Sequence, residues 1–399
     1  MNPYLLTTLL FITLAFLGAV DTAITSFELS PWFNALRWLR VHLITLGIMT
    51  EMLFGMLPLI IAHRYQQPRP APRFDIWLVL NLGILGLLIG MPIVNHTIIL
   101  GAGTLVFAAT IMLMHQLWQM RPNTNHPPAP SRYFYLAGLA YLLLGIFIGT
   151  GLWLGWTAKL AMKVPIEVHI HANNWGFLSL VFAGLLIDLA PRFTGRPLTS
   201  NKGINTLFWL ITLGALGLVL GPWTGSLYFS VPGLILHLSG TLALLYLTIR
   251  NFRQANLFTT PGPWHLVTAY TWLLAPVLIA PLIIFEAPGF PGAGIEANAP
   301  QALIYGWVLQ FAFALLPYFY ARILLNQTDA PLGGSWFSLI TLHAGGVFLW
   351  ASIFFKPFQA PLHGTAYTLW LIAFLPIIPQ LWTLTRQSWQ RIETALATN

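Results

Sequence analysis

The chain has 399 residues, of which 57% are hydrophobic and only 7% are charged. Soluble domains carry about 25% charged residues, so this composition excludes an ordinary soluble globular protein. The net charge of +8 does not indicate nucleic-acid binding, because in membrane proteins an excess of Lys and Arg usually lies in cytoplasmic loops. Since the chain contains no cysteine, disulfides, thiolate metal sites and covalently attached c-type haem are also excluded.

Twelve segments are apolar enough to cross a bilayer, which takes about 20 residues. They predict an all-α polytopic membrane protein with a single transmembrane domain over residues 1–399. Residues rich in Pro, Gly, Asn and charge separate the spans through short connections, so no soluble domain is expected. The predicted spans are 4–20, 36–62, 74–92, 96–118, 133–156, 166–190, 203–221, 227–249, 264–285, 300–325, 334–354 and 363–385.

The basic residues between the spans predict the orientation. With twelve spans, the loops after even-numbered spans share a side with both termini. That side holds 13 of the 18 Lys and Arg residues, and the opposite side holds the other five. Because cytoplasmic loops carry the excess of positive charge, we expect both termini in the cytoplasm of a bacterial-type inner membrane.

Spans 2, 6 and 10 share a pattern: a polar residue near the outer end, and a glycine five residues later. The segments are His42-Leu-Ile-Thr-Leu-Gly47, His171-Ala-Asn-Asn-Trp-Gly176 and Gln301-Ala-Leu-Ile-Tyr-Gly306. Their regular separation predicts three four-helix units, about 1–120, 121–255 and 256–399, in a pseudo-threefold arrangement. Chance is the alternative, since glycine is common in membrane helices.

Seven histidines gather toward the outer side of the predicted bundle, whereas His63, His115, His126 and His265 belong to the cytoplasmic side. The outer third holds His42, His96, His169, His171 and His363, with His237 and His343 deeper in spans 8 and 11. An ionisable group inside a membrane is costly and indicates a functional site. Two imidazoles on facing helices could hold haem iron, and three could hold copper. For each histidine, the alternative is an interfacial or helix–helix hydrogen bond.

Three further features concern the spans that carry the repeat. His169 and His171 are two residues apart, which on a helix turns their side chains by about 200°, so both cannot face one site. Glu51 lies in the middle of span 2, where it could relay protons, hold a metal or form a hydrogen bond. Asp188 and Arg192 are four residues apart and suit a surface ion pair.

Residues 169–198 resemble the NnrS family, through His171-Ala172, Gly176 and the closing Thr194-Gly195-Arg196-Pro197-Leu198. Glu51-Met52-Leu53-Phe54-Gly55 is similar to another stretch of that family. The resemblance implies a twelve-span membrane protein that contains haem and copper and is linked to nitric oxide metabolism and nitrosative stress. One departure is that Thr50 precedes Glu51, where the family has a histidine close by.

The layout also resembles subunit I of haem–copper oxidases and nitric oxide reductases, which have twelve spans and pseudo-threefold symmetry. That family carries histidines in spans 7 and 10. Here those two spans contain no histidine, and Gln301 takes the repeat position in span 10. The resemblance therefore implies a degenerate relative with redistributed ligands.

These observations favour an NnrS-like protein that binds haem b and acts on or senses nitric oxide or a related redox ligand. The expected haem ligands are His42 and His171, followed by His237 and His343. Copper is a second candidate cofactor, with candidate ligands His169, His171, His96, His363 and Glu51. If the protein is an enzyme, a haem-dependent oxidoreductase is expected.

The expected partners are the lipid bilayer, a small gaseous ligand and another membrane protein, and no nucleic acid is expected. Two functions of other classes stay open. One is a cofactor-free transporter, whose broken helices would come from the proline-containing spans 2, 6, 9 and 10. The other is a membrane assembly subunit that docks through the outer loop around residues 287–300.

Overall fold

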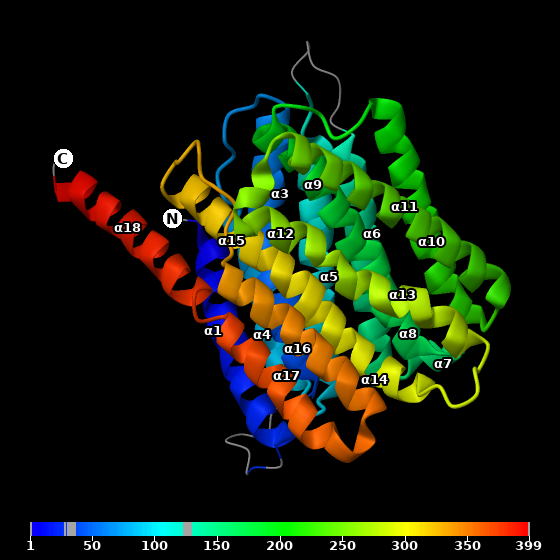
Figure 1. Ribbon diagram of the computed structural model, residues 1–399. Coiled ribbons are helices and arrows are strands. Elements are labelled where there is room, and N and C mark those ends of the chain that lie inside the picture. The colour runs from blue at the N-terminus through cyan, green and yellow to red at the C-terminus, as the bar shows by residue number, and fades with distance from the viewer. Residues whose placement is uncertain (1, 28, 30–36, 123–129, 398–399) are drawn as a thin grey trace. The chain divides into compact units, whose positions relative to one another are not determined.

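The computed structural model describes residues 2–27, 29, 37–122 and 130–397 (Figure 1). His126 lies outside these residues. Every regular element in the described part is a helix. Eleven of these helices are long and apolar enough to cross a membrane, and α4 (Phe74–Gly90) is a shorter apolar helix. They correspond one to one to the twelve predicted spans, so the prediction of an all-α polytopic membrane protein is confirmed.

The chain divides into two compact units. Unit 1 combines Met1–Gly55 with Phe258–Asn399, and unit 2 is Met56–Leu257. Helix α3 (Thr50–Arg64) and the short turn η3 (Leu257–Thr259) cross the boundaries. The other helices of unit 1 are α1 (Pro3–Ser26), α2 (Arg37–His42), η1 (Leu43–Met49), α12 (Pro261–Thr268), α13 (Tyr270–Ile284), α14 (Gly292–Ala302), η4 (Leu303–Val308), α15 (Leu309–Leu324), α16 (Trp336–Phe354), η5 (Lys356–Phe358), α17 (Gln359–Ala373) and α18 (Ile377–Ala397). Unit 2 contains α4, α5 (His96–Gln119), α6 (Ser131–Leu154), α7 (Trp156–Lys159), α8 (Pro165–His171), η2 (Ala172–Leu178), α9 (Ser179–Thr194), α10 (Asn201–Thr224) and α11 (Leu227–Gln254).

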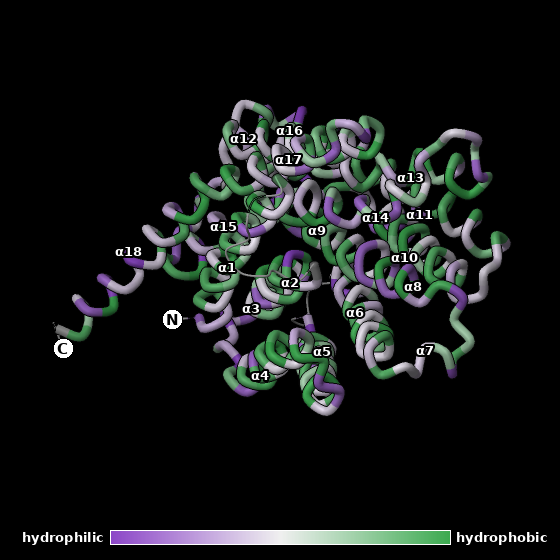
Figure 2. Tube along the Cα trace, turned by 90° about the horizontal axis from the view of Figure 1, so that it is seen from below, coloured by the Kyte–Doolittle hydropathy of each residue, from purple (hydrophilic) through white to green (hydrophobic). Residues whose placement is uncertain are grey.

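Consecutive helices pack as hairpins within each unit. In unit 2 these are α4 with α5 and α10 with α11, and in unit 1 α16 with α17. Small residues allow the close approach: a side chain on Gly217 of α10 would overlap Gly233 of α11. Such packing replaces the hydrophobic effect as the source of helix association in lipid. Figure 2 shows hydrophobic residues along most of the helices, as lipid-facing and packed surfaces require.

Spans 2, 6 and 10 are the interior helices. In their most apolar stretches 83%, 83% and 100% of the residues are buried, whereas in every other described candidate span the share is 56% or less. These are the same three spans that carry the sequence pattern. Span 10 starts earlier than predicted, since residues 292–300 are helical. The expected docking loop around 287–300 is therefore mostly part of a long helix.

Each of the three interior spans contains a π-helical segment at the same place in the pattern. η1 starts one residue after His42, η2 one residue after His171, and η4 two residues after Gln301. π-Helical residues are well under 1% of proteins and often mark functional sites. The three segments therefore recur at matching positions of the sequence pattern.

The π-helical turn has the same local consequence in all three spans. The N–H groups of Thr50, Ser179 and Leu309 bond to the carbonyl five residues earlier. These bonds bypass the carbonyl four residues earlier, which belongs to Leu46, Trp175 or Tyr305. In each span the bypassed residue directly precedes the repeat glycine.

The repeat glycines are needed because each lies against an aromatic ring of the preceding span. A side chain on Gly47 would overlap Phe11, one on Gly176 would overlap Tyr141, and one on Gly306 would overlap Trp272. The rings lie on α1, α6 and α13, the helices of spans 1, 5 and 9. The sequence pattern therefore encodes a close contact between the first and second helices of each predicted unit.

Candidate functional site

His171 ends α8 and lies half-buried in unit 2. Its Nδ1 is 2.6 Å from the carbonyl oxygen of Leu218 on α10. Because a carbonyl only accepts, Nδ1 carries the hydrogen and Nε2 presents a lone pair. No hydrogen bond reaches Nε2 from the residues that the structure describes. Metal-binding histidines are oriented in this way, with one ring nitrogen bonded to a carbonyl and the other directed to the metal.

His169 points toward a different neighbour. Its Nδ1 is 2.9 Å from the carbonyl oxygen of Gly145 on α6, and its ring packs against Gly149. Asn173, one turn later, donates to the carbonyl of His169 at 2.8 Å. The structure therefore directs His169 to α6 and His171 to α10, as their spacing predicts, and does not bring them together as a chelating pair.

His237 on α11 is buried and bonded through both ring nitrogens. Nε2 lies 3.1 Å from the carbonyl oxygen of Trp175, and Nδ1 lies 3.3 Å from the hydroxyl of Thr241. The Trp175 carbonyl is the one that the π-helical turn bypasses, so His237 supplies the missing donor. This arrangement matches the helix–helix hydrogen bond that was the alternative to a haem ligand.

The Trp175 ring contacts the imidazoles of both His171 and His237. It is edge-on to His237, with centroids 5.2 Å apart, and edge-on to His171, with centroids 6.3 Å apart. Edge-to-face contacts of this kind stabilise aromatic packing by about 0.5–1.5 kcal/mol. His171, Trp175 and His237 therefore form one packed group around η2.

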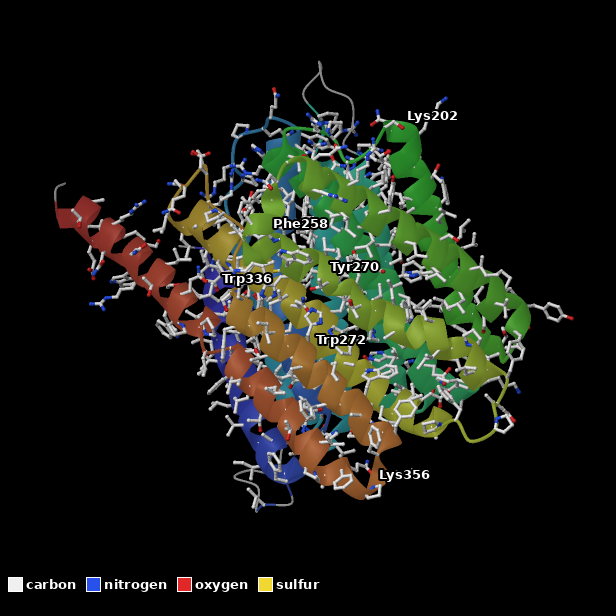
Figure 3. All side chains as sticks on the ribbon, viewed as in Figure 1. Lys202, Phe258, Tyr270, Trp272, Trp336 and Lys356 are labelled. Atoms are coloured by element: carbon white, nitrogen blue, oxygen red, sulfur yellow. The ribbon has the colours of Figure 1, made fainter. Side chains whose placement is uncertain are left out.

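His343 lies on α16 in unit 1, and both its ring nitrogens are also engaged. The indole N–H of Trp272 donates to Nδ1 at 3.1 Å, so Nε2 carries the hydrogen and lies 2.8 Å from the hydroxyl of Thr268. The side-chain amide of Gln310 on α15 donates to the same Thr268 hydroxyl at 2.9 Å. Figure 3 labels Trp272, and marks Trp336 and Lys356 near the two ends of α16. His343, Thr268 and Gln310 therefore connect three spans through hydrogen bonds.

His42 closes α2 in unit 1. Its Nδ1 is 2.7 Å from the carbonyl oxygen of Trp38, one turn earlier, and its ring stacks on the Trp38 ring with centroids 4.3 Å apart. The carbonyl fixes the tautomer as it does for His171. The two equivalent residues of the repeat therefore share a carbonyl-bonded Nδ1, but for His42 the carbonyl comes from its own helix.

The remaining predicted metal ligands are dispersed. His96 is exposed at the start of α5 in unit 2. In unit 1, His363 contacts the hydroxyl of Ser26 at 2.9 Å, and the buried Glu51 accepts a hydrogen bond from Thr7 at 2.8 Å. Among the described residues, no three His, Asp or Glu side chains gather as they would around a metal ion.

Two buried polar groups have partners that the sequence did not indicate. Asp188, expected in a surface ion pair with Arg192, is buried. It binds the Nε of Arg64 at 3.1 Å and accepts a hydrogen bond from the hydroxyl of Tyr135 at 2.7 Å. His265, expected on the cytoplasmic side, is fully buried and lies 3.1 Å from the carbonyl oxygen of Ser335. Gly334 allows this approach, since a side chain there would overlap the His265 ring.

Comparison with known proteins gives one partial similarity. No protein-family model matches the chain. Over 75 residues, 18% of this chain, it is 32% identical to the cbb3-type cytochrome c oxidase subunit CcoN1 of Stutzerimonas stutzeri, and the match spans 16% of that subunit. Together with the helical architecture, this similarity supports a polytopic membrane protein distantly like a haem–copper oxidase subunit, and it does not single out the NnrS family.

Proposed function

We propose that this protein binds haem b in the membrane and that His171 is an iron ligand. One observation carries the proposal: the Leu218 carbonyl orients the His171 imidazole and leaves Nε2 unbonded among the described residues. A polarised imidazole with an available nitrogen is the donor that haem iron takes. The absence of cysteine from the sequence favours non-covalent b-type haem.

The partial similarity to a subunit of a haem–copper oxidase supports the same proposal. His42, in unit 1, is a separate proposed haem ligand, because it occupies the equivalent place in span 2 and its Nδ1 is likewise bonded to a carbonyl. His237 and His343 are not included, since both nitrogens of each ring take part in hydrogen bonds.

The finer proposal is an NnrS-like role in nitric oxide metabolism in a bacterial-type inner membrane, with both termini cytoplasmic. The motif around His171 and the distribution of Lys and Arg support it. Apolar gases dissolve in lipid, so a site among apolar helices would need no polar channel. Nitric oxide added to the reduced protein should then shift its absorption bands. Unchanged bands would contradict the proposed role in nitric oxide metabolism.

The decisive experiment is an absorption spectrum of the purified, reduced protein from haem-replete cells, with haem and copper measured on the same sample. The expected result is a Soret band with sharp α and β bands, lost in His171→Ala and restored by added imidazole. His115→Ala, which changes an exposed histidine of α5, is the matched control. A colourless wild-type preparation would overturn the proposal.

A further inference from the structure

The helical stretch that contains the last predicted span, 363–385, is too long for one crossing. From Lys356 to Leu396 the chain forms a nearly continuous helical stretch of 41 residues. At 1.5 Å per residue this would be about 60 Å long, whereas the hydrocarbon core of a bilayer is about 30 Å thick. The stretch turns at residues 374–376, between α17 and α18. The second half of α18 must therefore lie outside the hydrocarbon core.

One face of α18 is occupied by unit 1 itself. Leu381, Thr385 and Ser388 are buried, and α18 packs against α15. The Arg391 guanidinium donates to the carbonyl of Leu325, just after α15 ends, at 2.7 Å. A cation at a helix C-terminus interacts favourably with the helix dipole and with its unpaired carbonyls. This contact fixes the helix rotation and decides which residues face outward.

The apolar side of α18 extends beyond the residues that unit 1 covers, and four large side chains on it are exposed. Trp382, Trp389, Ile392 and Leu396 have 55%, 54%, 39% and 73% of their surface exposed. Their spacings of seven, three and four residues place them on one side of the helix. Polar residues occupy the remaining side: Arg386, Gln387, Gln390 and Thr394. Figure 2 shows hydrophilic and hydrophobic residues alternating along α18.

We propose that residues 386–397 form an amphipathic helix that lies in the membrane interface, with Trp389, Ile392 and Leu396 in contact with phospholipid. The helix continues directly from a membrane span, so the bilayer surface is the nearest apolar phase. Exposed tryptophans are typical of this interface, where an apolar ring and a polar N–H are both accommodated. The indole N–H of Trp389 is bonded to Glu393, so this ring can enter the interface with its donor satisfied.

The composition distinguishes this segment from a second membrane crossing and from a free tail. A crossing would require about 20 apolar residues, and polar side chains recur throughout 386–397. A tail in water would leave a tryptophan, an isoleucine and a leucine exposed on one side. A helix with one apolar and one polar side is the type that binds in the interface plane.

The chain's lack of cysteine allows a direct test by spin labelling. Single cysteines replace apolar-side residues in Trp389→Cys, Ile392→Cys and Leu396→Cys. Polar-side residues are replaced in Gln387→Cys, Gln390→Cys and Thr394→Cys. Each labelled full-length protein is placed in vesicles of phosphatidylethanolamine and phosphatidylglycerol. Collisions with oxygen, which concentrates in lipid, are compared with collisions with a water-soluble nickel complex.

The proposal predicts high oxygen accessibility at the three apolar-side positions and high nickel accessibility at the three polar-side positions. Ile235→Cys, on an exposed apolar position of α11, provides the lipid reference. High nickel accessibility at all six positions would show a helix in water and overturn the proposal. Shielding of residues 389, 392 and 396 from both reagents, with spin–spin coupling between copies, would show a protein contact and would also overturn it.

Discussion

His171 in unit 2 and His343 in unit 1 are both half-buried histidines on apolar helices, and they differ in how many ring nitrogens are bonded. A carbonyl takes Nδ1 of His171, and no described residue bonds Nε2. An indole and a hydroxyl take both nitrogens of His343. The comparison teaches that two histidines placed alike on membrane helices can differ in the atoms they leave available. The hydrogen bonds around the ring separate a histidine with one nitrogen unbonded among the described residues from one that joins helices.

The largest expected effect is on haem binding, when the proposed ligand His171 is replaced. His171→Asn keeps a donor near the position of Nδ1, so the bond to Leu218 can survive, but it removes Nε2. We expect haem affinity to fall by more than about 100-fold, because even changes to groups that only orient a metal ligand cost about 10- to 100-fold. His343→Asn should leave the haem content of the purified protein unchanged. Equal losses in both variants would remove the distinction between the two histidines.

The next effect concerns the glycine beside η2. Gly176→Ala places a methyl group against Tyr141, and overpacking of this kind costs about 1–3 kcal/mol. We expect a lower free energy of unfolding in mixed micelles, measured by circular dichroism. Gly101→Ala on α5 is the matched control, since no heavy atom beyond its own helix neighbourhood lies within 4 Å of the added carbon. Equal stability of the two variants would contradict the close contact at Gly176.

A smaller effect on the free energy of unfolding tests whether His237 acts as a hydrogen-bond donor. His237→Leu leaves the bypassed carbonyl of Trp175 without a donor, which should lower the free energy of unfolding by about 1 kcal/mol. His237→Gln offers an amide N–H in its place and should recover most of that loss while keeping the haem spectrum. If His237 were instead an iron ligand, both variants would lose the spectrum alike.

The smallest expected effect is on stability, and it concerns His343 in unit 1. Trp272→Phe removes the indole donor to His343 and should cost about 0.5 kcal/mol, the size typical of hydrogen bonds between membrane helices. Unfolding measurements on Trp272→Phe, His343→Gln and the double variant give the coupling between the two residues. Additive losses would indicate that the bond contributes nothing to stability.

Much of the architecture could be predicted from the sequence. Apolar length marked all twelve spans, because a bilayer imposes a minimum length on each helix. The recurrence of a glycine five residues after His42, His171 and Gln301 singled out spans 2, 6 and 10, and the structure shows that these are the interior helices. The π-helical turns beside these glycines could not be predicted, because an inserted residue in a helix leaves no periodic signal of its own.

The candidate site could be predicted only in part. The sequence alone determined which residue types were available: histidines in membrane helices, and no cysteine. It also indicated that His169 and His171 face different directions, because helix geometry is local. Only the tertiary structure decided which ring nitrogens are bonded, since the partners that His171, His237 and His343 find on other helices lie 47 to 75 residues away in the sequence. The same holds for Asp188, whose partner Arg64 is remote in sequence, because side-chain hydrogen bonds between helices depend on packing that no local pattern encodes.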